Sequence, residues 1–291
     1  MFNLGNSIDL IINSAAKVSH YGSYKDFYNT NVKSVEKIIH FANLFSKKIF
    51  HISTLSVSGN SLVDQFYMEQ HFKEEVQFTE KDLFIGQSLE NVYIRSKFEA
   101  ERIILDSVLK GTDAYILRVG NLMPRLSDGK FQENIDENAY MNRLKTFIKM
   151  KCIPDNLINT YLEFTPIDIT ASAIYKIIKF SNKENIVYHI FNHNHLYVKD
   201  MLNILKSLNI EISLVENNIF KEKVDTILNS SKSNDISTLI NDLDKNRNLN
   251  YDSKIKINSK HTQKLLKLYG FEWPKIDKKY IQNILKLIKG D

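Results

Sequence analysis

Two residues four positions apart, Tyr93 and Lys97, have the chemical types needed to deliver a proton to a carbonyl oxygen. This spacing places both side chains on one face of a helix. A phenol has an ordinary pKa of about 10, and a neighbouring ammonium group lowers that pKa because it favours the phenolate. We therefore expect Tyr93 to protonate the oxygen that becomes an alkoxide when a carbonyl group is reduced.

A hydroxyl group is expected beside this pair. Thr54 follows the apolar segment KIFHIS at 48–53, which we interpret as a strand. A hydroxyl group that donates to a developing oxyanion stabilises its charge. Tyr and Lys are frequent in this chain, so the pair alone predicts an exposed helix face more readily than a site. The interpretation as a site therefore depends on the strand ends that surround the pair.

Strands and helices alternate in the first part of the chain. We predict strands at 8–13, 48–53 and 113–117, and helices at 29–45 and 93–109. Such alternation indicates a parallel sheet with covering helices. Small or polar residues follow two of the strands, as Ser14-Ala15-Ala16 and as RVGN at 118–121. Ligands of open α/β sheets bind at these carboxyl ends of strands.

The alternation becomes less regular after residue 121. We predict helices at 137–150, 165–180, 198–208 and 277–289, and a strand at 186–191. The stretch 216–260 is polar, with short apolar patches at helical spacing. We expect a cofactor domain at 1–125 and a mixed, mainly helical substrate domain at 126–291, interleaved with the sheet near 160–195.

Several motifs together resemble one family. IINSAA, NxNV, HISTLSVSG, YIRSK and LRVGN resemble the extended short-chain dehydrogenase/reductases. RVGNLMPRLSDGKFQEN, FTPIDITASAI, HIFNHNH and GFEWP resemble more closely the thioester reductase domains that end nonribosomal peptide synthetases. The resemblance covers nearly the whole chain. It implies an α/β fold with a Rossmann-like, doubly wound parallel sheet and a mainly helical C-terminal substrate subdomain.

The resemblance also implies an activity: reduction of a thioester bound to a phosphopantetheinyl carrier protein, which releases an aldehyde or an alcohol. NADPH is the expected cofactor, and NADH is left open. The implied catalytic residues are Thr54, Tyr93 and Lys97. The implied cofactor-binding residues are Ser14, Ala15, Ala16, Asn31, Val119 and Gly120, and Asn121 is expected to face the substrate. Val119 stands where the family usually has proline.

One departure from the family concerns glycine. None of the nine glycines forms GxGxxG or GxxGxxG, so the loop that binds the cofactor pyrophosphate is missing. We therefore expect an incomplete sheet, without the first three strands of the family fold, in which 8–13 becomes an apolar edge strand. The chain alone should bind cofactor poorly, and an upstream polypeptide is expected to complete the sheet.

Two alternatives remain open. The chain could be another extended short-chain enzyme, such as a nucleotide-sugar epimerase or dehydratase, although it shows no recognisable sugar-nucleotide motif. It could also be a non-catalytic remnant that binds a carrier protein. The missing pyrophosphate loop favours the second alternative for the isolated chain. The intact Thr54, Tyr93 and Lys97 indicate instead that catalysis was retained until recently or is completed by another polypeptide.

Composition narrows the class of protein. The net charge is +5, but only six of the 39 basic residues are arginine, so nucleic-acid binding is not expected. Cys152 is the only cysteine, which excludes an intrachain disulfide and a cysteine metal cluster and favours the cytoplasm. No apolar run approaches the ~20 residues of a membrane span.

Other conspicuous residues have structural explanations that we prefer. His193 and His195 indicate a surface turn rather than a metal site, because no third ligand is placed by spacing. His51 is expected to be a packed core residue rather than a base, and Trp273 a packing anchor. The lysine-rich C-terminal helix is interpreted as a solvated face rather than a docking site for an acidic carrier protein.

Overall fold

A computed structural model describes residues 2–18, 22–59, 62–63, 76–133, 135, 138–181, 185–229, 243, 249 and 255–289. Contacts divide the chain into two compact units. The sheet unit comprises Met1–Gly120, Thr170–Phe191 and Ser253–Glu272. The helical unit comprises Asn121–Ile169, Asn192–Asp252 and Trp273–Asp291.

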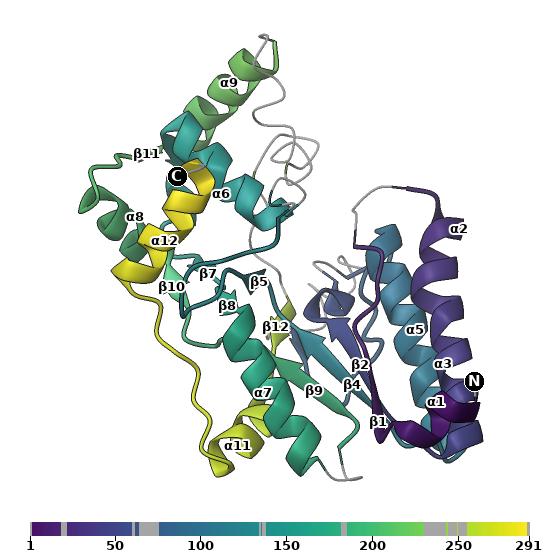
Figure 1. The fold of residues 1–291 in the computed structure, drawn as a ribbon. Helices are drawn as coiled ribbons and strands as arrows, with labels where there is room; N and C mark the ends of the chain where they lie inside the picture. Colours follow the sequence, from purple (N-terminus) through teal and green to yellow (C-terminus); the bar gives the residue numbers. More distant parts are fainter. Residues whose placement is uncertain are drawn as a thin grey trace. The chain divides into compact units, whose positions relative to one another are not determined.

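A four-stranded parallel sheet organises the sheet unit (Figure 1). Its strands lie in the order β1 (Leu10–Asn13), β2 (Lys48–Thr54), β4 (Ala114–Val119) and β9 (Val187–Ile190). The strands predicted from the alternating pattern are all present, and the α/β fold class is confirmed. β1 pairs with β2 from Leu10 opposite Lys48 to Asn13 opposite His51, and forms an edge of this sheet.

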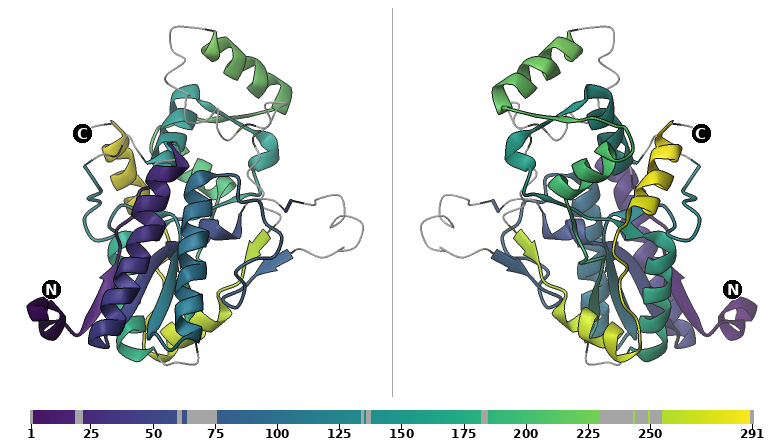
Figure 2. Two further views of the ribbon diagram at one scale, coloured as in Figure 1. Left: turned by 90° about the vertical axis from the view of Figure 1, so that its right-hand side faces the viewer. Right: turned by 90° about the vertical axis from the view of Figure 1, so that its left-hand side faces the viewer.

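Two long helices, α3 (Lys33–Phe45) and α5 (Val92–Leu109), lie side by side against one face of the sheet (Figures 1 and 2). The short helices α1 (Phe2–Ser7) and α2 (Tyr24–Phe27) and a π-helical turn (Tyr28–Val32) precede α3. Asn91 caps α5, because its side-chain oxygen accepts hydrogen bonds from the backbone N–H groups of Tyr93 and Ile94. The cap fixes the first turn of the helix, where Tyr93 lies.

Alternation along β2 decides which side chains face α5. Ile49 belongs to the apolar cluster beneath α3 and α5, and His51 and Ser53 point to the same side. On the opposite face Phe50 stacks on Tyr115 of β4, with ring centroids 4.9 Å apart. The helix side of the sheet is therefore apolar near the start of β2 and polar near its end.

The remaining elements of the sheet unit are α7 (Ile167–Phe180), which begins in the helical unit, a 3-10 turn (Leu55–Ser58), β3 (Val76–Phe78), β12 (Ile255–Ile257) and α11 (Lys260–Leu268). β3 and β12 form a parallel pair although about 180 residues separate them (Figure 2). None of β3, β12 and α11 was predicted from the sequence.

The helical unit contains α6 (Ala139–Met150), α8 (Val198–Lys206), α9 (Asn217–Leu228), α12 (Lys278–Lys289) and a 3-10 turn (Asp155–Leu157). Its short strands are β5 (Leu122–Met123), β6 (Cys152–Pro154), β7 (Tyr161–Leu162), β8 (Thr165–Pro166), β10 (Leu196–Tyr197) and β11 (Ser213–Val215). They pair as β5 with β8, β7 with β10 and β6 with β11. The predicted helices are present, and the short strands were not predicted.

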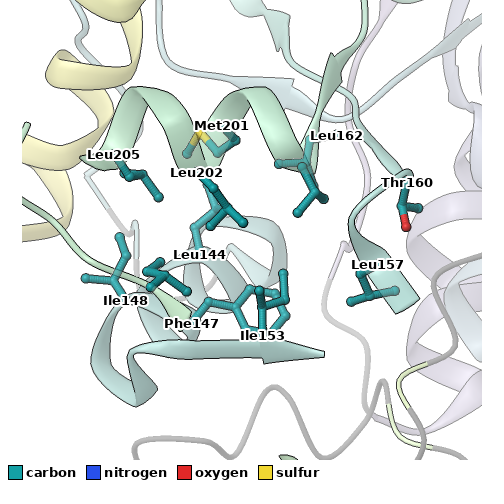
Figure 3. Close-up of a pocket in the computed structure, with 12 residues that line it drawn as sticks. Leu144, Phe147, Ile148, Ile153, Leu157, Thr160, Leu162, Met201, Leu202 and Leu205 are labelled. Carbon is teal, nitrogen blue, oxygen red and sulfur yellow. The ribbon is translucent and has the colours of Figure 1, made fainter. Parts of the chain in front are cut away.

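An apolar pocket lies between α6 and α8 of the helical unit (Figure 3). Its walls include Leu144, Phe147, Met201 and Leu202, and Thr160 is the only polar residue among the described residues that line it. Such a lining can accept apolar groups. Among the described helices, none is both long enough and apolar enough to cross a membrane.

Candidate active site

The end of β2 and the first turn of α5 bring Thr54 and Tyr93 together. The hydroxyl of Thr54 hydrogen-bonds the phenol of Tyr93 and favours its deprotonated form. Thr54 is held in place because its Oγ1 accepts a hydrogen bond of 3.1 Å from the backbone N–H of Ser56. The side chain of Thr54 is only 9% exposed. Two of the three predicted catalytic side chains are thus in direct contact.

Burial dominates the acidity of Tyr93. Desolvation raises the pKa of the phenol above its ordinary value, and the Thr54 hydrogen bond opposes that rise. The expectation that Lys97 makes this phenol acidic is wrong for this structure. Lys97 lies one turn further along α5, but its Nζ is engaged by β2: it donates to the carbonyl oxygen of Ile52 at 2.8 Å.

Lys97 is itself buried, with 2% of its surface exposed. Desolvation lowers its pKa to about 8, and the carboxylate of Glu101 opposes this shift. Its Nζ lies 3.1 Å from Nε2 of His51. On the other side of the imidazole, Nδ1 lies 3.0 Å from the amide nitrogen of Asn13.

The sequence interpretation missed the contact of His51 with Lys97, although it correctly placed His51 in the core. His51 and Asn13 are 1% and 5% exposed and lie opposite each other in the β1–β2 register. The sequence does contain a signal for this contact. Alternation along KIFHIST puts His51 on the side of the sheet that an amphipathic helix covers.

The segment after β1 was predicted to line the cofactor. Ser14 and Ala15 are exposed, and Ala16 is half-buried. Asn31 is buried beneath this segment: its Oδ1 accepts the N–H of Lys17 at 2.7 Å, and its Nδ2 donates to the Lys17 carbonyl at 3.0 Å. Asn31 therefore holds the backbone of the segment.

The same amide connects this segment to α5. Nδ2 of Asn31 also donates to Oγ of Ser96 at 2.9 Å, and Ser96 donates to the carbonyl oxygen of Tyr93 at 2.8 Å. At the end of β4, Val119 is buried, and the N–H of Gly120 donates to the carbonyl oxygen of Ile190 at 3.0 Å. The predicted cofactor-binding residues of the sheet unit thus belong to the ends of β1 and β4 and to the turn before α3.

Asn121 belongs to the helical unit and is exposed. Its backbone N–H donates to Oε1 of Glu163 at 2.7 Å, and its side-chain amide lies 3.3 Å from Oε2 of the same carboxylate. Burial raises the pKa of Glu163, and hydrogen bonds from Thr165 and Asn121 oppose the rise. Glu163 was not singled out from the sequence, where no motif marks it.

A buried ion pair lies deeper under the same face of the sheet. Arg118 of β4 donates from Nη2 to Oε2 of Glu101 at 2.7 Å, and both side chains are fully buried. Arg118 also reaches Nε2 of His189 at 3.1 Å. Because a guanidinium group only donates, that nitrogen is the acceptor, and Nδ1–H of His189 donates to the carbonyl oxygen of Asn258 at 2.8 Å.

The other residues weighed from the sequence have ordinary surroundings. His193 is exposed, and His195 stacks on Tyr161 with ring centroids 4.0 Å apart. Trp273 is buried, as expected for a packing anchor. Within the described ranges, no group of three or more His, Cys, Asp or Glu side chains is arranged to hold a metal ion.

Comparison with known proteins identifies similar chains. The sequence model of an NAD-binding family described as male sterility protein matches residues 1–174. A thiolation-reductase di-domain from an archaeal non-ribosomal peptide synthetase is 30% identical, with a TM-score of 0.84 over 99% of this chain. The reductase domain of the aureusimine biosynthetic cluster is 27% identical, with a TM-score of 0.78 over 97% of this chain.

Curated relatives are much longer than this chain. Probable polyketide synthase 45 of Dictyostelium discoideum is 28% identical over 176 residues, which are 59% of this chain and 5% of the relative. The two solved reductases are also longer, since the chain covers 59% of the archaeal di-domain and 69% of the aureusimine reductase.

Proposed function

The chain belongs to the NAD-binding family described as male sterility protein, and from this premise we propose that it carries the proton-donating part of a nicotinamide-dependent thioester reductase. The proposed substrate is an acyl group joined by a thioester to a carrier protein. The single observation that carries the proposal is the placement of Thr54 beside the phenol of Tyr93 at the carboxyl end of β2, with Lys97 one turn further along α5.

The proposed chemistry assigns a role to each of these residues. Addition of a hydride to the thioester carbonyl carbon turns its oxygen into an oxyanion. Thr54 donates a hydrogen bond to that oxygen, and Tyr93 transfers its phenolic proton to it. The resulting hemithioacetal breaks its C–S bond, releases the carrier thiol and leaves an aldehyde. A second hydride and proton addition would convert the aldehyde to an alcohol.

The sheet unit fits one end of a nicotinamide cofactor, which would supply the hydride. Exposed small residues, Ser14 and Ala15, follow β1 and leave room for close approach of a planar ring. Ala16, Asn31, Val119 and Gly120 are proposed to complete this part of the site, and Lys97 to hold the ribose. NADPH is the proposed form of the cofactor.

The pyrophosphate end lacks its usual binding loop, because none of the nine glycines forms the glycine-rich motif. We propose that a polypeptide segment outside these 291 residues supplies the loop. The chain alone should then bind the cofactor weakly. A dissociation constant measured by NADPH fluorescence, with and without the added segment, tests this part of the proposal.

A carrier protein is the proposed partner. The archaeal di-domain joins a thiolation domain and a reductase domain in one chain, which supports a substrate presented on a carrier. Asn121 is proposed to face the substrate: it is exposed, and Glu163 holds its amide. An exposed amide can hydrogen-bond the polar arm that joins an acyl group to its carrier.

Substrate assays distinguish this function from the alternatives. The completed enzyme should oxidise NADPH only when an acyl thioester of a carrier protein is present. Turnover of a nucleotide sugar would instead support an epimerase or dehydratase. Carrier binding without NADPH oxidation, in a preparation that binds NADPH, would support a non-catalytic binding role.

A further inference from the structure

Three buried polar side chains form a line from β1 to α5, and the proposed chemistry uses only one of them. Asn13, His51 and Lys97 are 5%, 1% and 2% exposed. The imidazole of His51 lies between its two neighbours, 3.0 Å from the amide nitrogen of Asn13 and 3.1 Å from Nζ of Lys97. The β1–β2 register sets Asn13 opposite His51, and α5 brings Lys97 above the same face.

We propose that His51 is a positioning residue that fixes Lys97 Nζ at the end of β2 and couples the charge state of Lys97 to the amide of Asn13. The proposal deepens the proposed function, because it concerns the lysine assigned to the cofactor ribose. A buried imidazole needs a partner for each ring nitrogen, and His51 finds them in the Asn13 amide and in Lys97 Nζ rather than in backbone groups.

The backbone of Ala15 determines where the hydrogens lie. Its N–H donates to Oδ1 of Asn13 at 3.3 Å, so the amide nitrogen of Asn13 is turned towards His51. That NH₂ group can only donate, which makes Nδ1 of His51 the acceptor. A neutral imidazole then carries its proton on Nε2, and this N–H points at Lys97 Nζ. Lys97 accepts it only as a free amine, while still donating to the Ile52 carbonyl.

A protonated Lys97 requires the opposite arrangement. An ammonium group has no lone pair, so Nε2 of His51 must become the acceptor and its proton must move to Nδ1. Asn13 must then present its oxygen to His51. The N–H of Ala15 loses its acceptor when the amide turns. Protonation of Lys97 therefore breaks the hydrogen bond from the Ala15 N–H to Asn13. Ala15 belongs to the segment after β1, which we propose lines the cofactor.

The surroundings make this change accessible near neutral pH. Burial lowers the pKa of Lys97 to about 8, and burial together with Lys97 keeps the pKa of His51 well below its ordinary value. The other charged groups near Lys97 are Glu101 on the same helix, which favours the ammonium form, and Arg118 on β4, which pairs with Glu101. Tyr93 faces Thr54 and stays protonated in this range because burial raises its pKa.

Nitrogen NMR tests the proposal without any measurement of catalysis. The proposal about His51 can therefore fail or succeed independently of the proposed function. In the 291-residue chain, we expect His51 to carry its proton on Nε2 above the midpoint of the Lys97 titration and on Nδ1 below it. The ¹⁵N shifts of the imidazole and of Lys97 Nζ should change with one common midpoint. A tautomer of His51 that stays the same while Lys97 titrates would overturn the proposal.

Substitution gives a second measurement. His51→Phe removes both the acceptor for the ammonium form and the donor to the amine form. Because the hydrogen bond of the charged form is the stronger one, the midpoint of Lys97 should fall by roughly 1 pH unit. His51→Gln, which retains an amide near Nε2, should restore part of the shift.

His189→Phe is the matched control, because His189 is equally buried on the same sheet and contacts Arg118 instead. It should leave the midpoint unchanged. An unchanged midpoint in a folded His51→Phe variant would contradict the proposal, and if that variant does not fold, the tautomer measurement on the unsubstituted chain decides.

Discussion

Burial, more than the neighbouring lysine, determines what Tyr93 can do. A phenol whose pKa is raised keeps its proton throughout the neutral range, so it is always ready to donate. The Thr54 hydrogen bond opposes this effect and stabilises the phenolate that remains after transfer. In the proposed reduction the acidity of Tyr93 would thus depend on Thr54 rather than on Lys97.

Replacement of Tyr93 separates proton donation from binding. In the completed enzyme, Tyr93→Phe should lower kcat by roughly 10²- to 10⁴-fold, the usual contribution of a general acid. The Kd for NADPH should change little, because the aromatic ring remains and only its hydroxyl group is lost. Tyr28→Phe, at a partly exposed tyrosine of the π-helical turn, is the control and should keep full activity. Near-normal kcat in Tyr93→Phe would remove this residue as the proton donor.

The lowered pKa of Lys97 predicts an unusual dependence of the free energy of unfolding on pH. Its folded pKa of about 8 lies below the unfolded value of about 10.4, so between these values the unfolded chain binds more protons than the folded chain. The free energy of unfolding should therefore rise with pH in this window. The contribution of Lys97 is lowest, and constant, below the folded pKa.

Urea unfolding between pH 7.5 and 9.0 measures this slope in a range where tyrosines, with an ordinary pKa of about 10, remain mostly protonated. The total effect of Lys97 is at most about 3 kcal/mol, from a pKa difference of about two units. Lys97→Met should be more stable at pH 7.5 and should lose most of the slope. A slope that persists unchanged in Lys97→Met would show that another group causes it.

The residues of this site differ in how far the sequence could predict them. Thr54, Tyr93 and Lys97 are marked by type and spacing alone, and the structure places them at one end of β2. The contact of His51 with Asn13 depends on the register of two strands about 35 residues apart. The register of two strands depends on how the whole face of the sheet packs. The sequence pattern of one strand alone does not show this packing.

At the scale of elements, α5 is the part that positions the site. Its first turn presents Tyr93, its second turn Lys97 and its third turn Glu101, all towards the sheet. Lys97 reaches His51, and Glu101 accepts a hydrogen bond of 2.5 Å from Ser53, two residues further along β2. Together these contacts from two turns of the helix set the register of α5 on β2.

The buried Glu101–Arg118 pair anchors that register. Glu101→Leu would leave the guanidinium of Arg118 buried without its carboxylate, at a cost of about 3–5 kcal/mol in the free energy of unfolding. Chemical denaturation of the two proteins measures the difference. Arg95→Gln breaks an exposed pair with Glu99 on the same helix and should barely move the denaturation midpoint. Equal effects of the two substitutions would mean that Arg118 finds another partner.

The elements themselves were predictable where they are long. α5 and β2 have enough residues to show a clear period, so the sequence located both. Strands of three residues, such as β3 and β12, show no period and pair across about 180 residues. Their existence depends on tertiary contacts, for example the burial of Phe78 and Ile255 in one cluster, which no local pattern records.

At the scale of the whole chain, family membership and structural similarity agree on the Rossmann-like class, with the sheet unit carrying the predicted catalytic and cofactor-binding residues. The sheet of this unit has an unusual edge. β1 lies at the end of the strand order, and within the described residues it pairs with β2 alone. In a complete doubly wound sheet of strand order 3-2-1-4-5-6, the fourth strand is central and lies beside the first. By the family resemblance β1 corresponds to that fourth strand.

This edge should make the isolated chain associate. Unpaired backbone groups along an apolar strand recruit further strands, and Ile12 of β1 is 50% exposed. Ile12→Lys places a charge on the edge, where it opposes pairing of two strands. Sedimentation velocity at increasing concentration should show less association for Ile12→Lys than for the unsubstituted chain. Tyr175→Lys adds the same charge at an exposed helical position and should not have this effect. If both chains remain monomeric at every concentration, the free edge of β1 does not drive association.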